Sequence, residues 1–177
     1  VFGLGKDRTT EIRAITESLK QQSKYNQLSP VVSISGHVQY SGSYPLTPKM
    51  KLSNLINAAA GVLPSRYDLS YVLISRTNAK TGKLEVITTQ LDNAKSSSDI
   101  LLKPEDKVRI FSSQDNRSES IKGIVALLKQ QRNFNQLANV VSISGHVEFP
   151  GTYPLTQKMK ITDLINAASG VLPTQYD

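Results

Sequence analysis

The residues best suited to contact a ligand lie in a segment that occurs twice in the chain. Residues 31–68 and 140–177 are nearly the same sequence, and Val31 aligns with Val140. In each copy a β-type stretch alternates apolar and polar residues, so its hydroxyl and imidazole groups share one strand face. An aromatic residue follows near the turn, where its ring could stack on a sugar or contact a partner. These candidate glycan or partner contacts are Ser33, Ser35, His37, Tyr40, Ser142, Ser144, His146 and Phe149.

Each of these candidates also has a purely structural interpretation. His37 and His146 occupy equivalent positions in separate copies, so we expect no metal site, and histidines that face solvent or an interface. Tyr44 and Tyr153 are predicted to pack over the following helix as core residues. For the aromatic residues at the turn itself, packing and surface contact both remain open. A solvated face is favoured over contact with an acidic glycan for the recurring lysines Lys49, Lys51, Lys158 and Lys160.

The chain offers no constellation of residues for catalysis. It contains no cysteine, which excludes disulfides, thiolate metal sites and cysteine nucleophiles. It also shows no set of nucleophile, base and orienting residue, no paired carboxylates at a short fixed spacing, and no glycine-rich phosphate loop. Asp68 and Asp177 recur in the two copies, and each is interpreted as a turn or cap residue. We therefore expect no enzymatic activity and no cofactor.

The charge and hydropathy of the chain are those of an ordinary globular protein. Hydrophobic residues make up 38% and charged residues 20% of the sequence, and the formal net charge is +7. The lysines and arginines are scattered without a run, which favours a solvated surface and predicts no nucleic-acid partner. No apolar stretch approaches the roughly 20 residues of a membrane span. Because the first residues read as the end of a repeat unit, the absence of a signal peptide carries no information.

Apolar periodicity predicts two helices that connect the copies, over residues 9–25 and 118–132. We expect Thr9 or Thr10 to cap the first connector, and Ser53 to cap a short helix inside the copy. Within one complete unit the predicted elements are strands at 31–39 and 44–47, a helix at 52–60, and strands at 71–76, 84–91 and 108–111. This order, with one helix against a mixed sheet, indicates an α+β two-layer domain of the β-grasp type. We expect one core that contains Ile34, Leu55, Ile56, Leu73 and Val86.

The repeat predicts four parts along the chain. They are the end of a preceding unit with a connector helix at 1–29, a complete domain at 30–111, a connector helix at 112–138, and the first half of a second domain at 139–177. A hairpin with one helix buries little apolar surface by itself. We therefore expect Ile143, Leu164 and Ile165 to be covered by the connector helix, by the complete domain or by a second chain.

Four short motifs, in this order, resemble the SLBB domain, the soluble-ligand-binding β-grasp module. They are SGHV at 35–38, GSYPL at 42–46, LSNLINAAAG at 52–61 and LKPEDKV at 102–108, and the second copy carries FPGTY at 149–153. Tandem SLBB domains are similar to those of outer-membrane polysaccharide export proteins, which form the periplasmic part of capsule and exopolysaccharide secretion channels. The resemblance implies a homo-oligomeric ring, polysaccharide in the assembled channel and an inner-membrane polysaccharide copolymerase as partner. It also implies a periplasmic location, associated with the bacterial outer membrane.

The chain departs from this family pattern at several points. Glu105 replaces the family's glycine at the third position of a turn, which predicts a type I turn, because type II requires φ > 0 there. The helical connectors are longer than the usual linkers, and the export-signature domain, lipidated cysteine and C-terminal membrane helix are not in this chain. The expected function is channel assembly and domain stacking. The alternative is a module that binds glycan or another soluble ligand through the polar strand face and the hairpin aromatics.

Overall fold

A computed structural model describes residues 6–23, 28–91, 99–132, 137–157 and 159–173. The helices are α1 (Lys6–Gln22), α2 (Leu52–Ala58), α3 (Arg117–Ser120), α4 (Lys122–Gln130) and α5 (Ile161–Ala167). The strands are β1 (Val31–Gly36), β2 (Gly42–Pro45), β3 (Tyr67–Thr77), β4 (Leu84–Thr89), β5 (Lys107–Ser112), β6 (Val140–Ile143) and β7 (Gly151–Pro154). We call residues 30–111 the first repeat and residues 139–177 the second repeat.

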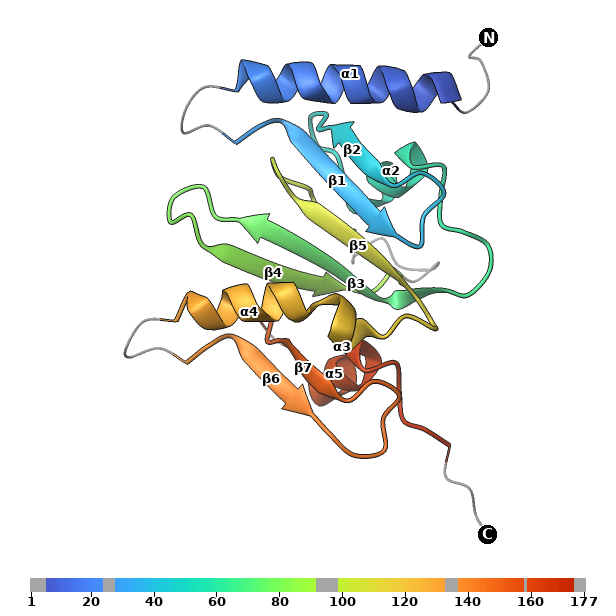
Figure 1. Cartoon of the computed structure of the whole chain (residues 1–177), viewed down its shortest axis with the longest axis vertical. Coiled ribbons are helices and arrows are strands. Elements are labelled where there is room, and N and C mark those ends of the chain that lie inside the picture. Colours follow the sequence, from blue (N-terminus) through green and yellow to red (C-terminus); the bar gives the residue numbers. More distant parts are fainter. Residues whose placement is uncertain (1–5, 24–27, 92–98, 133–136, 158, 174–177) are drawn as a thin grey trace.

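The first repeat is an α+β domain, which confirms the predicted fold class and element order. Its sheet has the strand order β2-β1-β5-β3-β4, with β1 parallel to β5 and the other neighbours antiparallel. Helix α2 covers one face through the buried Leu52 and Leu55 (Figure 1). Pro45 lies in the edge strand β2, as expected for a residue that cannot donate to a ladder.

The prediction of a single core is wrong, because both faces of the sheet are covered. Ile34 and Leu55 lie in a first core against α2, and Ile56 packs against it. Leu73 is buried in a second core on the opposite face, with Val86 packed beside it. Successive residues of a strand point to opposite faces, so the continuous buried run 71–74 of β3 supplies both cores.

Several predicted helix ends are also wrong. Helix α1 begins at Lys6, so Thr9 and Thr10 lie inside it and not at its N-terminus. Helix α2 is capped at Lys51, whose backbone N–H donates to Asn54 Oδ1 at 2.9 Å. Ser53 instead donates its hydroxyl to Asp99 at 2.7 Å. The second connector is two helices, α3 and α4, that meet at Ile121 (φ −108°).

The turn before β5 adopts the backbone conformation that the sequence argument rejected. Glu105 has φ +62°, as type II requires, and the Asp106 N–H donates to the Lys103 carbonyl at 3.1 Å. Two long-range hydrogen bonds hold this strained residue: its N–H donates to Val31 O at 2.7 Å, and its carboxylate accepts from Ser29 N at 3.0 Å. Tertiary contacts therefore outweigh the local preference of a non-glycine residue for φ < 0.

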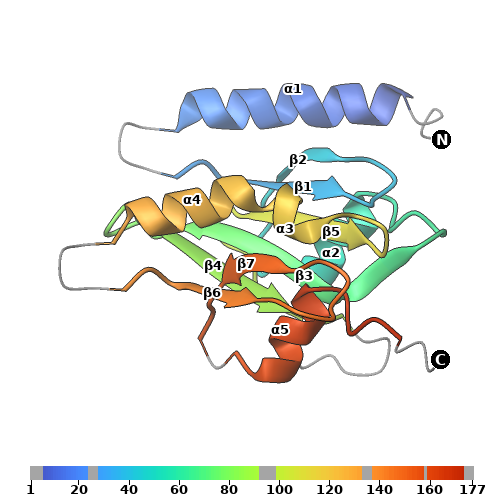
Figure 2. The same ribbon diagram turned by 60° about the horizontal axis from the view of Figure 1, so that its bottom comes forward.

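The second repeat folds as the β6–β7 hairpin with α5, and it packs on the rest of the same chain. Ile143 and Leu164 pack against the second core, which confirms intramolecular cover for these two residues. Ile165 is half-buried outside that core. Figure 2 shows the hairpin and α5 beside the first repeat, with α4 along the sheet.

The two connectors play related roles. Helix α1 lies along β2 at the edge of the sheet (Figure 1), where Ile12 packs against the first core and Thr16 is buried. Helix α4 packs on β6 and β7 in the same way, and its Val125 joins the second core. Because that core also contains Leu73 of β3, α4 bridges the two repeats.

Candidate functional site

The junction between the repeats is built around a buried charge, Arg117 of α3. Its side chain is fully buried, and Asn116 starts the helix by accepting a hydrogen bond from Glu119 N at 3.1 Å. An unpaired cation in such a position would be strongly destabilising. The groups that pair with this guanidinium therefore show which parts of the chain the junction holds together.

Arg117 contacts both repeats at once. Its Nη1 donates to the Asn166 carbonyl of α5 at 2.6 Å, and its Nη2 forms an ion pair with Asp68 of β3. The guanidinium carbon lies 5.7 Å from the ring centroid of Tyr71 and 5.6 Å from that of Phe111, within cation–π range. One side chain thus joins the start of β3, the end of β5 and the C-terminal part of α5.

Asp68 is positioned for this pairing by an irregularity in β3. The register between β3 and β5 shifts between Asp68 and Val72, and Ser70 N donates to Asp68 Oδ1 at 2.8 Å. Burial acts to raise the pKa of Asp68, but hydrogen bonds from Ser70 and the charge of Arg117 lower it below the ordinary 3.8. Asp68 is therefore a residue of strand β3 that pairs with Arg117, and the prediction of a turn or cap residue is wrong for it. Asp177, its counterpart in the second repeat, lies outside the described residues.

Two tyrosines complete the buried surroundings of Arg117. The Tyr71 and Phe111 rings lie 5.6 Å apart in a tilted arrangement. Burial raises the pKa of the Tyr71 hydroxyl, with a further contribution from Tyr153. Burial raises the pKa of Tyr153 to about 12, against a lowering by Arg117. Both phenols are consequently neutral packing groups at physiological pH.

Hydrogen bonds outside the core reinforce the junction. The side-chain amide of Gln131 pairs with edge strand β4 by accepting from Leu84 N and donating to Leu84 O at 3.1 Å. Thr88 of β4 and Thr156 of the second repeat share a hydrogen bond of 3.1 Å. The arrangement fixes one repeat against the other. Among the described residues, no cluster of His, Cys, Asp or Glu could hold a metal ion.

The structure places the predicted contact residues in two separate sets, one in each repeat. Ser33 is half-buried on β1, and Ser35 is exposed and donates to Val108 O at 3.3 Å. In the second repeat Ser142 shares a hydrogen bond of 3.0 Å with Thr152, and Ser144 is exposed. Nothing brings these two sets into one site, and their role as contacts stays a prediction.

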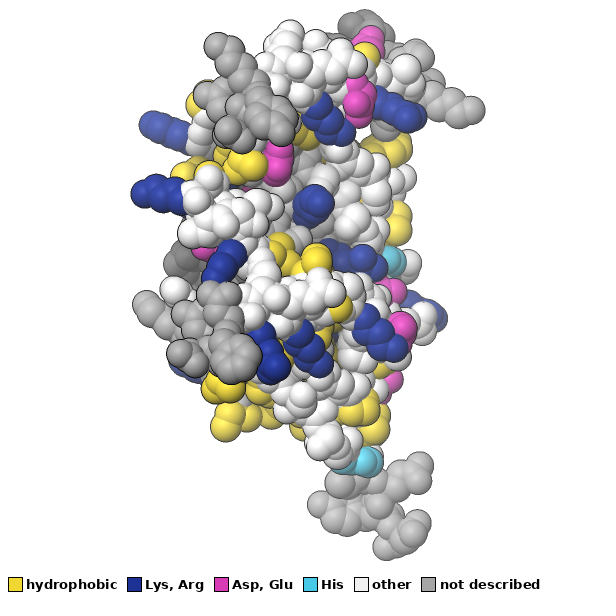
Figure 3. Space-filling model, turned by 60° about the vertical axis from the view of Figure 1, so that its left-hand side comes forward, with side chains coloured by type: hydrophobic (Ala, Val, Ile, Leu, Met, Phe, Trp, Pro, Cys, Tyr) yellow, Lys and Arg dark blue, Asp and Glu magenta, His cyan; other side chains and the backbone are white. Residues whose placement is uncertain are grey.

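The histidines each tether a strand end within their own repeat. His37 Nε2 is hydrogen-bonded to the carbonyl of Ser65, and His146 Nε2 lies 3.4 Å from the carbonyl of Pro173. Figure 3 shows the two histidines well apart on the surface, with Lys and Arg side chains spread between α1 and the second repeat. These positions match a local structural role for each imidazole.

The predicted burial of the two hairpin tyrosines is confirmed. Tyr44 and Tyr153 are 4% and 0% exposed, and each donates its hydroxyl at 2.7 Å to a backbone carbonyl, of Tyr40 and Phe149 respectively. Tyr40 and Phe149 are half-buried. The backbone carbonyls of Tyr40 and Phe149 accept these hydrogen bonds from the tyrosine hydroxyls. Both residues therefore stabilise the hairpin through their backbone, whatever their rings contact.

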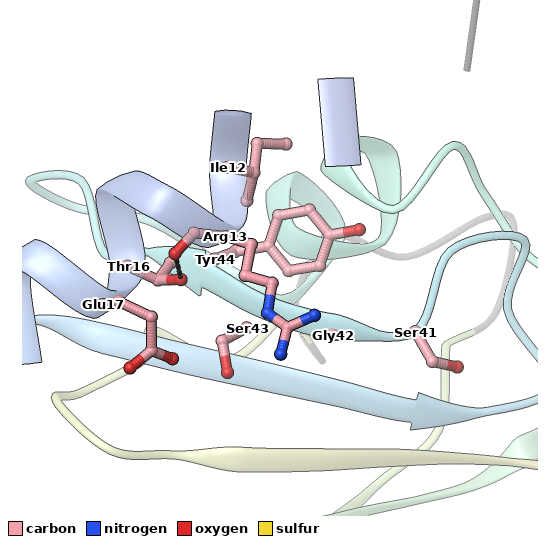
Figure 4. A pocket seen from close by; sticks show the side chains of 8 residues that line it. All are labelled: Ile12, Arg13, Thr16, Glu17, Ser41, Gly42, Ser43 and Tyr44. Carbon is pink, nitrogen blue, oxygen red and sulfur yellow. Dashed lines mark hydrogen bonds between the residues drawn. The ribbon is translucent and has the colours of Figure 1, made fainter. Parts of the chain in front are cut away.

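A groove of about 370 Å³ lies between α1 and the hairpin (Figure 4). Arg13 and Glu17 of α1 extend toward β2 there, and Ser43 lies below them. Gly42 of the first hairpin is equivalent to Gly151 of the second. A Cβ atom added to Gly151 would lie 2.5 Å from Ser118 Cβ of α3, whereas a Cβ atom added to Gly42 would have no other atom within 4 Å. The connector therefore packs more tightly on the second hairpin than on the first.

Sequence reasoning missed Arg117 as the centre of the junction. The available signal was recurrence, because Arg8 matches Arg117, and the Tyr-Asp pair at 67–68 matches that at 176–177. A charged residue in a connector is ordinarily read as solvated, so its recurrence was the only indication of burial.

Comparison with known proteins agrees with this architecture. The family model described as the SLBB domain matches residues 31–110, and a second SLBB domain model matches residues 140–177. A search among curated proteins found no match. Within the described residues, no helix is both long and apolar enough to cross a bilayer. SLBB domains occur in polysaccharide export proteins and bind ligands rather than catalyse reactions. This chain belongs to the SLBB domain family and carries two such domains in tandem.

Proposed function

We propose that this chain is a tandem SLBB segment of a capsule or exopolysaccharide export protein, where it holds successive SLBB units in a fixed stack. In this role it acts in the periplasm as part of a homo-oligomeric channel associated with the outer membrane. Its partners are the exported polysaccharide and an inner-membrane polysaccharide copolymerase. It has no enzymatic activity of its own.

The observation that carries this proposal is the Arg117 junction. A flexible tether between binding modules needs no buried charge, whereas here Arg117 is fully buried and bonds to both repeats. Helix α4 also shares its apolar residues between the two repeats. Such a junction transmits orientation from one unit to the next, as a channel wall built from stacked domains requires.

The test is polysaccharide export in cells that carry the full-length protein with Arg117→Met. We expect surface polysaccharide to fall strongly, because stacked units lose their fixed orientation. Arg132→Met is the matched control, since Arg132 is exposed at the far end of the connector, and it should export normally. Normal export by Arg117→Met at normal protein levels would contradict the stacking role. Turnover of any polysaccharide by the purified chain would contradict the non-enzymatic role.

A second candidate function is the binding of a soluble ligand or glycan by the first repeat. It is favoured by a groove of about 260 Å³ on the sheet face opposite α2, lined in part by Ser35 of the predicted polar strand face. Calorimetric titration of the chain with oligosaccharides tests it directly.

A further inference from the structure

The groove on the second sheet face has a distinctive set of side chains. Lys107 and Arg109 point to it from β5, because residues two apart in a strand share a face. Their neighbours across the ladders are hydroxyl residues: Ser35 pairs with Arg109, and Ser75 pairs with Lys107. The exposed part of this face is therefore basic and rich in hydrogen-bonding groups.

These two cations lack ionic partners in the described part of the chain. Neither Lys107 nor Arg109 forms a salt bridge there, and Arg109 Nε is buried without a hydrogen-bond acceptor. The Arg109 guanidinium lies 5.6 Å from the Phe111 ring centroid, which holds it in place. The one acid that lines the groove, Glu105, directs a carboxylate oxygen to Ser29 N at 3.0 Å. An unpaired, pre-positioned guanidinium favours an oxyanion.

The opposite wall of the groove is apolar. Ile124 and Leu127 of α4 line it, and Leu127 is 51% exposed. A volume of about 260 Å³ lies below the roughly 300–1,000 Å³ of pockets for drug-sized ligands. The space suits one ring-sized unit with an apolar face toward α4 and a charged group toward β5.

We propose that this groove binds an acidic sugar unit of a polysaccharide, with its carboxylate or phosphate oxygens on Arg109 and Lys107. The hydroxyls of Ser35 and Ser75 donate to the carbonyls of Val108 and Lys107, so their oxygens accept hydrogen bonds from hydroxyl groups of the same unit. Leu127 contacts its apolar ring face. The ligand class rests on the proposed function, because a free oxyanion would satisfy the two cations equally well. The site itself rests only on the groove.

The experiment is an NMR titration of the whole chain with tetragalacturonate, with neutral maltotetraose and sodium phosphate as comparison ligands. We expect tetragalacturonate to shift the amide signals of Ser35, Ser75 and Arg109, and to bind more weakly as salt increases. Lys107→Gln and Arg109→Gln should each weaken its binding by about tenfold, as the loss of a charge-assisted hydrogen bond predicts. Lys80→Gln is the control, since Lys80 is exposed in the β3–β4 loop outside the groove.

Equal binding of maltotetraose, or unchanged binding by Lys107→Gln, would overturn the oxyanion site. Phosphate binding as tight as that of tetragalacturonate would overturn the assignment to a glycan. Lys107 is exposed, so its variant decides the question even if Arg109→Gln fails to fold. Lys107 also lies outside the Arg117 junction, so failure of this site leaves the export test of Arg117→Met unaffected.

Discussion

Replacing Arg117 by Met should uncouple the second repeat from the first. Methionine has a similar length and is apolar, so the change removes the charge and its hydrogen bonds while leaving little cavity. The variant loses the ion pair with Asp68, the hydrogen bond to Asn166 O and the contacts with Tyr71 and Phe111. It also leaves the Asp68 carboxylate without its cation.

The expected loss of stability is large. Removing one partner of a buried ion pair costs roughly 3–5 kcal/mol. The Asp68 side chain is 22% exposed and keeps its hydrogen bond from Ser70 N. Because this residual solvation reduces the penalty, we expect about 2–4 kcal/mol. Adding Asp68→Asn should restore at least about 0.5 kcal/mol, because the double variant leaves no unpaired charge.

The assay is urea unfolding followed by circular dichroism, with amide exchange read at residues of β6, β7 and α5. Wild-type chain should lose protection in both repeats together, whereas Arg117→Met should lose it first in the second repeat. Arg132→Met should change stability by less than about 0.5 kcal/mol, as an exposed substitution does. A similarly small loss for Arg117→Met, or a double variant no more stable than the single one, would refute the account of the junction.

Three further predictions follow from other parts of the structure. The pKa of Asp68 is lowered by folding, so the stability that its carboxylate contributes is present above the unfolded pKa of 3.8 and is lost as pH falls through the folded pKa. The difference in stability between wild type and Asp68→Asn, measured by urea unfolding, should therefore shrink in acid. Gly36→Ala should destabilise far more than Gly145→Ala in thermal melts: both glycines have φ near +90°, but only the Cβ added at Gly36 meets a backbone atom, Ile110 O at 2.0 Å. Leu55→Ala should cost roughly 2–5 kcal/mol in the same melts, because Leu55 is fully buried in the first core, and a loss under about half a kcal/mol would contradict that packing.

Local sequence patterns were enough to predict the repeat, the element order and the type of each element. These features depend on local periodicity and turn residues, which is why the strands around Ile34 and Leu73 and the helix around Leu55 were predicted close to their observed positions. The burial of Tyr44 and Tyr153 also followed from the sequence pattern, because a tyrosine recurs at the same position in both copies, just before a short helix whose apolar face must be covered.

Long-range packing sets which sheet face each residue serves and how the repeats meet, and local patterns do not predict either. Leu73 faces the second core because α4 and the second repeat occupy that face, and no local pattern states what will cover a strand. Glu105 adopts φ +62° because two hydrogen bonds outweigh its local preference: its N–H donates to the distant Val31 carbonyl, and its carboxylate accepts from Ser29 N. Arg117 is buried because its partners, distant in sequence, converge on one point, and a residue's burial depends on such neighbours rather than on its own chemistry.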